Sequence, residues 1–391
     1  MFHSRTSRLC TSLNWKEWAG YYAVCSYDTS HEPEYFAFRH SAGLIDVSPL
    51  YKYEVRGPDA ASFLSRLTVK DLARLAPGRV TYLCWCDDDG MVVDDGTVSR
   101  LGRDHFRVTA AEPSLSWFER QALGFDVAVE DVSGRLGALA LQGPTSRAIL
   151  DSVVEADLAK LRFFRLVETR VEATPVWITR TGYTGDLGYE IWVEESGAET
   201  LYDALMEAGR SHGILPAGLD ALDVARVEAG FVMNGVDYFS AHHCLIDERK
   251  SSPYDLGLGW TVQLDRDPFI GQEALRREKE RGSRWVFRGL DVSWEGLEEV
   301  FAGYGLPPEL GSHAWRDGRP VYDGRGRWVG QATSGAWSPT LKKNLALAQL
   351  EPEVAGVGGE IEIEVTAEYR RHTVAATVVK TPFFDPPRKR A

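Results

Sequence analysis

Two stretches of the chain share one order of elements: a short alternating strand, a Gly-Pro corner and a segment of helical spacing. They are residues 52–67, with Gly57-Pro58 at the corner, and residues 138–150, with Gly143-Pro144 at the corner. Proline suits the first turn of a helix because its missing N–H would have no partner there. The repetition predicts duplicated α+β modules, although a common turn can also recur by chance.

Alternation of apolar and polar positions predicts further strands outside these units. Such runs occupy residues 80–86, 91–93, 97–99, 105–108 and 189–193. Asp87–Gly90 reads as a hairpin turn, with Asp-Gly supplying the positive backbone angle. From about residue 285 onward, segments such as 360–365 and 373–379 alternate and predict an all-β region. Residues 296–311 are acidic and contain Gly and Pro, which is typical of an irregular surface insertion.

Length and composition indicate an ordinary globular protein of two to three domains. The chain has 391 residues, 44% of them hydrophobic and 26% charged. No apolar run approaches the roughly 20 residues needed to span a bilayer, and the first residues contain no continuous apolar segment typical of a secretory signal. Five unevenly spaced cysteines fit a reducing compartment rather than a disulfide framework. We therefore expect a cytoplasmic protein that does not bind membranes.

The net charge of −13 argues against nucleic acid as a partner, because phosphate neutralisation needs clustered Lys and Arg. The one basic cluster is Arg388-Lys389-Arg390, which we interpret as a solvated terminus. An acidic surface does not forbid an anionic ligand, since a basic pocket can lie within it.

The cysteines and histidines do not form a convincing metal motif. Cys84 and Cys86 point to one face of a strand, but no second pair accompanies them. His242-His243-Cys244 are adjacent, and adjacent side chains rarely converge on one ion. We predict no metal site, and we interpret Cys84 and Cys86 as small buried hydrophobes.

Two segments carry candidate chemistry. In the first, a strand-like run ends in Asp94-Asp95, whose side chains should point to opposite faces, so that one reaches a cleft. In the second, Thr179–Trp192, three glycines imply a tight backbone that could approach a planar ligand. Glu190 follows in an alternating strand, where it could accept two parallel N–H bonds from a 2-amino-pyrimidinone edge. Both segments also fit ordinary strand positions, so local pattern alone does not decide.

An ordered series of motifs favours the functional interpretation of both segments over ordinary strand positions. From residue 15 to about 385 the chain resembles the T-protein of the glycine cleavage system (aminomethyltransferase) and its folate-dependent demethylase relatives. The matching segments are Gly43–Ser48, Gly90–Asp95, Leu141–Pro144, Arg180–Gly185, Arg226–Gly230, Phe269–Leu275, Thr333–Gly335, Ser338–Leu341 and Val379–Phe383. The resemblance implies an α+β fold, a three-domain cloverleaf around a central tetrahydrofolate funnel.

The resemblance also implies domain limits and residue roles. Residues 1–50 with 135–280 would form the folate-binding α+β domain, residues 51–134 a second α+β domain, and residues 285–391 a C-terminal β-barrel or jelly roll. Asp95 would be the catalytic carboxylate near the reacting folate nitrogen. The cofactor-binding residues would be Glu190, on the pterin edge, with Tyr82, Tyr183 and Arg226.

Departures from the T-protein pattern lie around the implied funnel. Pro49-Leu50 stands where the family has His-Met, Thr109 where it has Asn, and Leu222 where it has a folate-directed Arg. Residues 238–254 also differ. We therefore expect transfer of a one-carbon unit, a methyl group, from a small methylated donor to tetrahydrofolate. The alternatives are an aminomethyltransferase that acts on a lipoyl carrier protein and a non-catalytic folate-binding protein.

Overall fold

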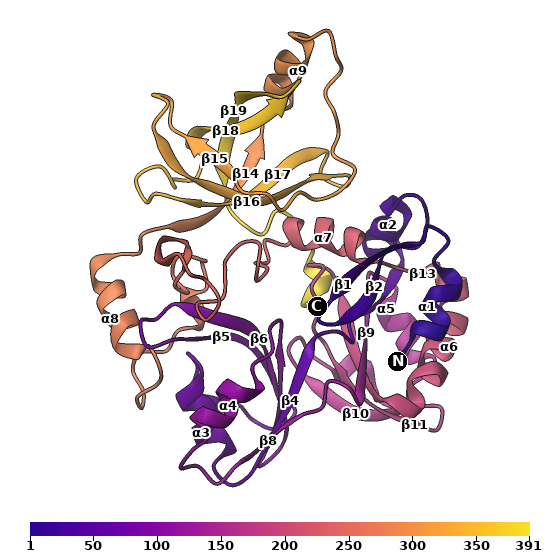
Figure 1. Ribbon diagram of the computed structural model, residues 1–391. Helices are drawn as coiled ribbons and strands as arrows, with labels where there is room; N and C mark the ends of the chain where they lie inside the picture. Colours follow the sequence, from indigo (N-terminus) through magenta and orange to yellow (C-terminus); the bar gives the residue numbers. More distant parts are fainter.

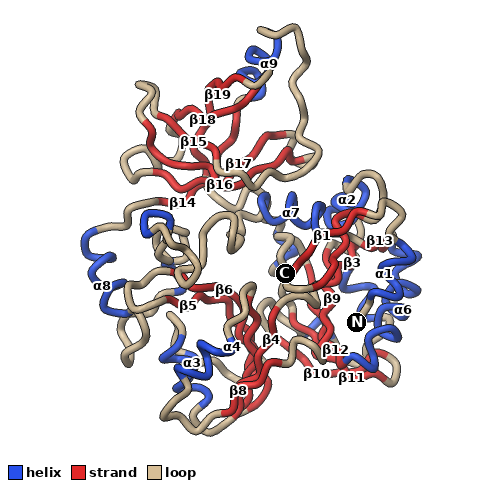
Figure 2. The backbone as a smooth tube through the Cα atoms, viewed as in Figure 1, coloured by secondary structure: helices blue, strands red, loops and turns tan.

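The computed structural model describes residues 1–391 as three bodies: a six-stranded sheet, a five-stranded sheet and a closed β-barrel. The three bodies surround a central region, with the barrel at the top of Figure 1 and the two sheets below it. The same arrangement can be followed by secondary structure in Figure 2. The predicted α+β cloverleaf with a C-terminal barrel is confirmed.

The six-stranded sheet has the order β10-β11-β12-β9-β3-β13. Its strands are β3 (Ala42–Asp46), β9 (Leu136–Gln142), β10 (Leu166–Val171), β11 (Thr174–Thr179), β12 (Gly188–Glu194) and β13 (Ile214–Pro216). Helices α5 (Ser146–Asp151) and α6 (Ala198–Gly209) pack on one face through leucines and isoleucines. The other face turns towards the centre of the molecule, where α2 (Glu32–His40) and α7 (Leu219–Glu228) lie.

The five-stranded sheet has the order β5-β6-β7-β4-β8. Its strands are β4 (Tyr51–Arg56), β5 (Val80–Cys86), β6 (Val92–Gly102), β7 (His105–Ala110) and β8 (Ala128–Asp131). Helices α3 (Ala60–Leu67) and α4 (Leu115–Gln121) cover one face with a core that includes Phe63, Trp85 and Phe118. Residues 240–271 run beside this sheet: the N–H of Ala241 donates to Val92 O and that of Ile270 to Arg66 O.

The barrel closes in the order β14-β17-β16-β15-β18-β19. Its strands are β14 (Val286–Val292), β15 (Arg319–Tyr322), β16 (Trp328–Ser338), β17 (Lys343–Leu350), β18 (Glu360–Ala367) and β19 (Arg370–Val379). The expectation of an irregular insertion at 296–311 is wrong for its first part, because helix α9 occupies Trp294–Ala302. The Ser293 side chain accepts a bond from the Gly296 N–H and so caps this helix.

The ends of the chain both pack on the six-stranded domain. Helix α1 (His3–Leu9) and the hairpin β1 (Asn14–Trp18) and β2 (Tyr21–Ser26) lie at its edge, while α8 (Gln272–Arg281) lies near β5. The prediction of a solvated basic tail is wrong for two residues. Arg388 donates to Asp186 at 2.7 and 2.8 Å, and Lys389 is buried with its ammonium 5.0 Å from the Phe231 ring centre.

The two strand–corner–helix units are β4-α3 and β9-α5, and they are arranged as repeats. Asp71 and Asp157 stand at the same distance from the two Gly-Pro corners, and each caps a short 3₁₀ helix by accepting the N–H two residues later. The equivalent residues Arg79 and Arg165 pair with each other in an antiparallel bridge. An antiparallel contact between equivalent positions is what a local two-fold axis produces.

The two repeats also place corresponding residues in register. Glu54 on β4 pairs with Arg107 on β7, whereas the equivalent Ala140 on β9 pairs with Glu190 on β12. Arg107 bonds to Glu54 at 2.8 Å and reaches across to the other sheet, 4.7 Å from the Trp177 ring centre. It therefore joins the two sheets at the centre of the molecule.

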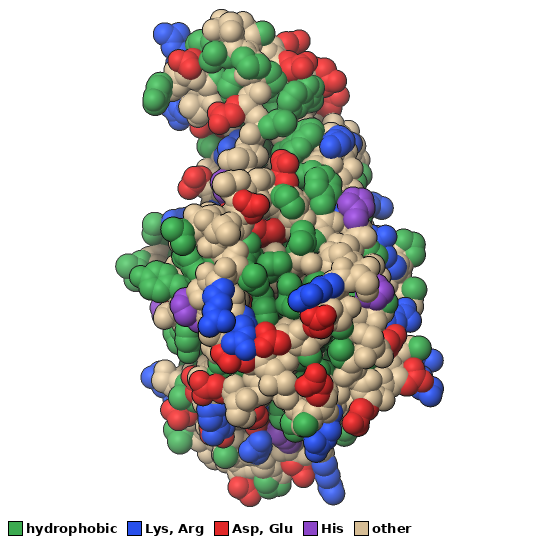
Figure 3. All heavy atoms as spheres, turned by 90° about the vertical axis from the view of Figure 1, so that its right-hand side faces the viewer, with side chains coloured by type: hydrophobic (Ala, Val, Ile, Leu, Met, Phe, Trp, Pro, Cys, Tyr) green, Lys and Arg blue, Asp and Glu red, His purple; other side chains and the backbone are tan.

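The surface carries both signs of charge. Figure 3 views the side of the six-stranded domain, where acidic, basic and hydrophobic side chains are interspersed. None of the helices is both long and apolar enough to cross a bilayer.

Candidate functional site

The paired carboxylates lie inside a strand rather than at its end. Strand β6 continues through Asp94 and Asp95 to Gly102, so the expected strand end after Asp95 is wrong. Gly96 permits this continuation, because a Cβ there would lie 1.9 Å from the Thr109 carbonyl oxygen of β7. The predicted alternation holds: Asp94 is fully buried and Asp95 is partly exposed.

Asp94 anchors the backbone around it. Its Oδ2 accepts the N–H groups of Ala111 and Glu112, both at 2.9 Å, and its Oδ1 accepts the Asn234 amide at 3.0 Å. Burial and the neighbouring Asp95 carboxylate raise the pKa of Asp94 to about 7, against the opposing effect of these donors. Asp94 therefore holds the strand and its neighbours in place and leaves Asp95 as the accessible member of the pair.

Asp95 is held by two tyrosines. Tyr82 of β5 donates to Oδ2 at 2.7 Å, and Tyr238, from the loop after α7, donates to Oδ1. Burial raises the pKa of Asp95, and the two phenol donors lower it. The pKa values of both phenols are raised well above the ordinary value by burial and by the Asp95 charge, so both hydroxyls keep their protons. Each carboxylate oxygen retains acceptor capacity for a further donor.

Glu190 projects from β12 towards the centre, with alanines on the β9 side of that sheet face and Trp192 two residues further along its own strand. Its direct neighbour on β9 is Ala140, and Ala138 lies on the same face of that strand. Oε2 accepts from Thr181 at 2.6 Å, whereas Oε1 has no partner from the protein. Burial raises the pKa of Glu190, opposed by the hydroxyls of Thr181 and Thr179.

The glycines before Glu190 serve packing rather than contact with a planar ligand. A Cβ at Gly182 or Gly188 would lie 1.9 or 2.1 Å from the Gln142 side-chain oxygen. Gln142 is fully buried, accepts from Thr184 at 2.9 Å and fills the space that both glycines leave open. This contact fixes the loop from which Glu190 emerges.

Tyr183 and Arg226 lie near each other, and the charges of Arg226 and Asp95 act on the Tyr183 hydroxyl. Burial raises the pKa of Tyr183, whose hydroxyl donates to Val232 O. Arg226 is completely buried and paired with Asp223 at 2.7 Å and Asp237 at 2.6 Å. Its Nη2 is buried without a partner, so this nitrogen alone is free to meet a ligand.

Leu222 stands one turn before Arg226 on α7 and supplies no guanidinium. A different arginine approaches the same turn: Arg316, from the segment after α9, donates to Asp223 at 2.7 Å. Its side chain is 37% exposed, and no other hydrogen bond engages it. The Arg316 guanidinium is therefore bonded to the residue that follows Leu222, the position at which the family has an arginine.

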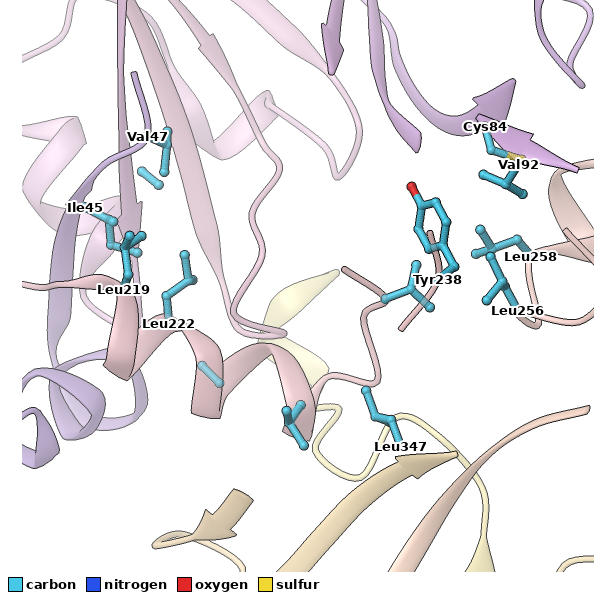
Figure 4. Close-up of a cluster of buried hydrophobic side chains, with 14 of the residues drawn as sticks. Ile45, Val47, Cys84, Val92, Leu219, Leu222, Tyr238, Leu256, Leu258 and Leu347 are labelled. Atoms are coloured by element: carbon cyan, nitrogen blue, oxygen red, sulfur yellow. The ribbon is translucent and has the colours of Figure 1, made fainter. Parts of the chain in front are cut away.

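The centre is lined by apolar side chains from all three bodies. Figure 4 shows Ile45, Val47, Leu219 and Leu222 on one side and Tyr238, Leu256 and Leu258 on the other, with Leu347 of the barrel below. Partly exposed aromatic residues pack against this cluster, among them Trp18, Tyr82, Trp177 and Tyr183. Apolar and aromatic side chains with a few polar groups among them are typical of the lining of ligand sites.

The cysteine and histidine side chains that were considered as metal ligands do not form a common cluster. Cys84 and Cys86 are buried in the central apolar cluster, as interpreted from the sequence. No group of three or more His, Cys, Asp or Glu side chains is arranged to hold a metal ion.

Of the five predicted site residues, only Asp95 and Tyr82 are hydrogen-bonded to each other. Glu190 stands on the other sheet with no hydrogen bond to either, and Arg226 contacts other residues of its own segment. Sequence reasoning missed Tyr238 and Asn234, which bond to the Asp pair. Both lie in or beside the segment that differs from the T-protein pattern, and that departure was the available signal.

Comparison with known proteins supports the family resemblance. The GCVT N-terminal domain family matches residues 6–266, and the glycine cleavage T-protein C-terminal barrel domain family matches residues 304–385. The aminomethyltransferase of Geobacillus thermodenitrificans is 35% identical over 362 residues, 91% of this chain and 90% of that protein. The trimethylamine-oxide aldolase of Ruegeria pomeroyi is 34% identical over an alignment of 403 positions, which covers 100% of this chain but 47% of that protein.

The chain thus spans about half the length of the Ruegeria relative. Among solved structures, the glycine cleavage system aminomethyltransferase T from Bartonella henselae superposes with a TM-score of 0.83 at 25% identity, covering 98% of this chain and 97% of the other. The protein therefore belongs to the glycine cleavage T-protein family and is a folate-dependent transferase.

Proposed function

We propose that this chain transfers a methyl group from a small methylated donor to tetrahydrofolate bound between the two sheets. The observation that carries the proposal is the pair of anchors on opposite sides of the centre: Asp95 held by two phenols, and Glu190 with a free carboxylate oxygen. Both carboxylates keep acceptor capacity that the protein does not use.

The residues present fit tetrahydrofolate. Glu190 Oε1 lacks a partner, and its neighbours on β9 are alanines, against which a flat ring could pack. A carboxylate in this setting can accept two N–H groups of a pterin edge, a bond strengthened by charge. The buried, unpaired Nη2 of Arg226 supplies a further donor near Tyr183. When bound, tetrahydrofolate supplies the nitrogen that accepts the one-carbon unit.

In this proposal Asp95 would receive the proton of the reacting nitrogen. Its carboxylate is fixed by Tyr82 and Tyr238, so it would not have to reorient when the ligand binds. Its raised pKa makes it a better proton acceptor than an exposed aspartate, because proton transfer is most effective when the pKa approaches the working pH. The apolar walls exclude water and strengthen these contacts.

The expected class of donor rests on Tyr238, the first residue of the altered segment 238–254, and on one relative. Tyr238 donates to Asp95, and this polar contact would suit a small substrate beside that carboxylate. The Ruegeria relative is named for trimethylamine oxide, a small methylated amine derivative. We therefore expect methylated amines, amine oxides or sulfonium compounds as donors.

Mass-spectrometric detection of 5-methyl- and 5,10-methylenetetrahydrofolate from a panel of such donors tests the proposal. One donor should turn over with the wild type and fail with Asp95→Asn, while folate binding is retained. Formation of the methylene product alone would contradict methyl transfer.

A second candidate is aminomethyl transfer from a lipoyl carrier protein. The match to the Geobacillus aminomethyltransferase over nearly the full length of both chains favours it. It predicts release of ammonia from an aminomethyl-lipoyl carrier and no turnover of free donors. Saturable folate binding without any transfer would instead support a non-catalytic binding protein.

A further inference from the structure

The segment Asp385–Ala391 lies beside the central region, where the chain end is labelled C in Figure 1. Phe384, which precedes it, donates its N–H to Glu228 O at the end of α7, at 3.0 Å. Arg180 of the six-stranded domain holds it from the other side, since its guanidinium donates to two carbonyl oxygens of the segment at 3.4 Å. The side chains of the segment are therefore fixed next to α7 and the loop that precedes Glu190.

The charges of this segment are paired one to one, except at Lys389. Arg388 donates to both oxygens of Asp186 at 2.7 and 2.8 Å, and Arg390 donates to both oxygens of Asp385 at 2.8 and 2.9 Å. The Lys389 ammonium has one carboxylate oxygen nearby, on Asp385, at 3.7 Å, which is beyond hydrogen-bond distance. Because Asp385 is already held by Arg390, Lys389 is left without an anion of its own.

Lys389 is nevertheless only 7% exposed. Burial lowers the pKa of its ammonium, and Asp385 offsets this lowering only in part. The ammonium lies 5.0 Å from the centre of the Phe231 ring, and an aromatic ring makes up for only part of the hydration that a cation loses. Three N–H donors that are nearly buried and make no hydrogen bond point to an acceptor that the protein does not supply.

Phe231 connects this ammonium to residues that we assign to folate. Its ring stacks on Tyr183 with ring centres 5.5 Å apart, and its carbonyl oxygen accepts from Arg226 Nη1 at 3.3 Å. The Nη2 atom of Arg226 is also buried without a partner. Two cationic side chains with unused donors, Lys389 and Arg226, therefore both contact Phe231.

We propose that Lys389 binds a carboxylate of a ligand in the central site, a role that rests on the proposed function. A single carboxylate fits because one positive charge is uncompensated here, while Asp186 and Asp385 would repel a more highly charged anion. Two ligands of the proposed reaction can bring this group. Tetrahydrofolate carries carboxylates on its glutamyl end, and a methylated amino acid would carry one as the donor.

Calorimetric titration tests the first source, with the bis-amide of tetrahydrofolate as the matched ligand in which both glutamyl carboxylates are neutral. If folate brings the carboxylate, Lys389→Met should weaken tetrahydrofolate binding at least tenfold and leave the bis-amide within threefold of the wild type. Lys389→Arg should restore most of the affinity, because it restores the charge. Arg390→Met, the exposed neighbour, is the control and should bind both ligands as the wild type does.

Steady-state kinetics test the second source, with N-methylalanine and N-methylethylamine as donors that differ only in the carboxylate. If the donor brings it, Lys389→Met should raise the KM for N-methylalanine at least tenfold while kcat stays within threefold, and the amine should be unaffected. A loss that is equal for both members of each pair would show a structural role and overturn the inference.

The inference is equally wrong if Lys389→Met changes neither the folate pair nor the donor pair. Failure of the proposed function gives a different result. A wild type that binds tetrahydrofolate but forms no 5-methyltetrahydrofolate would contradict methyl transfer, and the comparison of tetrahydrofolate with its bis-amide would then decide the role of Lys389 by itself.

Discussion

Replacing Glu190 with Ala is expected to remove most of the affinity for tetrahydrofolate. Hydrogen bonds to a charged group contribute about 1.5–3 kcal/mol each, and two are available on a pterin edge. Because Thr181 already shares Oε2, we take the lower part of the combined range, about 3–4 kcal/mol. That corresponds to a dissociation constant raised roughly 150-fold to 1,000-fold.

Calorimetric titration with tetrahydrofolate measures this loss directly. The variant should fold, because Thr179 and Thr181 remain bonded to each other at 2.7 Å after the carboxylate is removed. Glu194→Gln, on the same strand but exposed, is the matched control and should bind as the wild type does. An affinity of the Ala variant within threefold of the wild type would refute the assignment of Glu190 to the ligand.

Three further outcomes follow from the structure. Tyr238→Phe should lower kcat/KM for transfer about tenfold or more, while folate affinity stays within threefold. The acidic limb of the pH–rate profile should move to higher pH, because Asp95 loses a donor that lowers its pKa. An unchanged pH–rate profile would contradict this. The folded-state pKa of Asp94 is raised to about 7, so between the ordinary pKa of an aspartate and pH 7 the folded protein binds more protons than the unfolded chain. The free energy of unfolding should therefore fall as the pH rises through that window. Asp95→Asn should flatten this slope in urea titrations at several pH values, and an unchanged slope would refute the coupling between the two carboxylates. Gly188→Ala should destabilise the fold by about 2 kcal/mol or more because its Cβ would overlap buried Gln142, whereas Gly324→Ala, in open space, should lower the melting temperature little.

Much of the fold could be predicted from the sequence because period-two alternation and turn chemistry are local properties. Strand β5 has the predicted limits, and the Asp94–Asp95 alternation was correct because side chains of any strand point alternately to its two faces. The end of β6 was misplaced, since a strand continues through polar residues when a neighbouring strand pairs with it. Gly96, which admits the Thr109 carbonyl, has that role only in the folded sheet.

The site residues that the family resemblance names could be predicted from the sequence. The contacts that form only when distant segments meet in the folded protein could not. The bond from Tyr238 to Asp95 joins residues far apart in the chain, and no local pattern links them. The burial of Lys389 likewise depends on where the chain end docks, and charge alone suggested solvent. Arg226 was identified by type, but its two aspartate partners became visible only when α7 and its following loop were placed together.

The bridge between Arg79 and Arg165 marks an approximate two-fold axis within a single chain, and this bears on the symmetry of the ligands that the centre could accept. Two identical halves meeting across an axis would offer every ligand the same group twice. Joined in one polypeptide, the halves are free to diverge, and at corresponding positions one now carries Arg107 and the other Glu190. Arg107 joins the two sheets, whereas Glu190 keeps one carboxylate oxygen without a protein partner. The two sides of the approximate two-fold axis therefore present different chemical groups to the centre of the molecule.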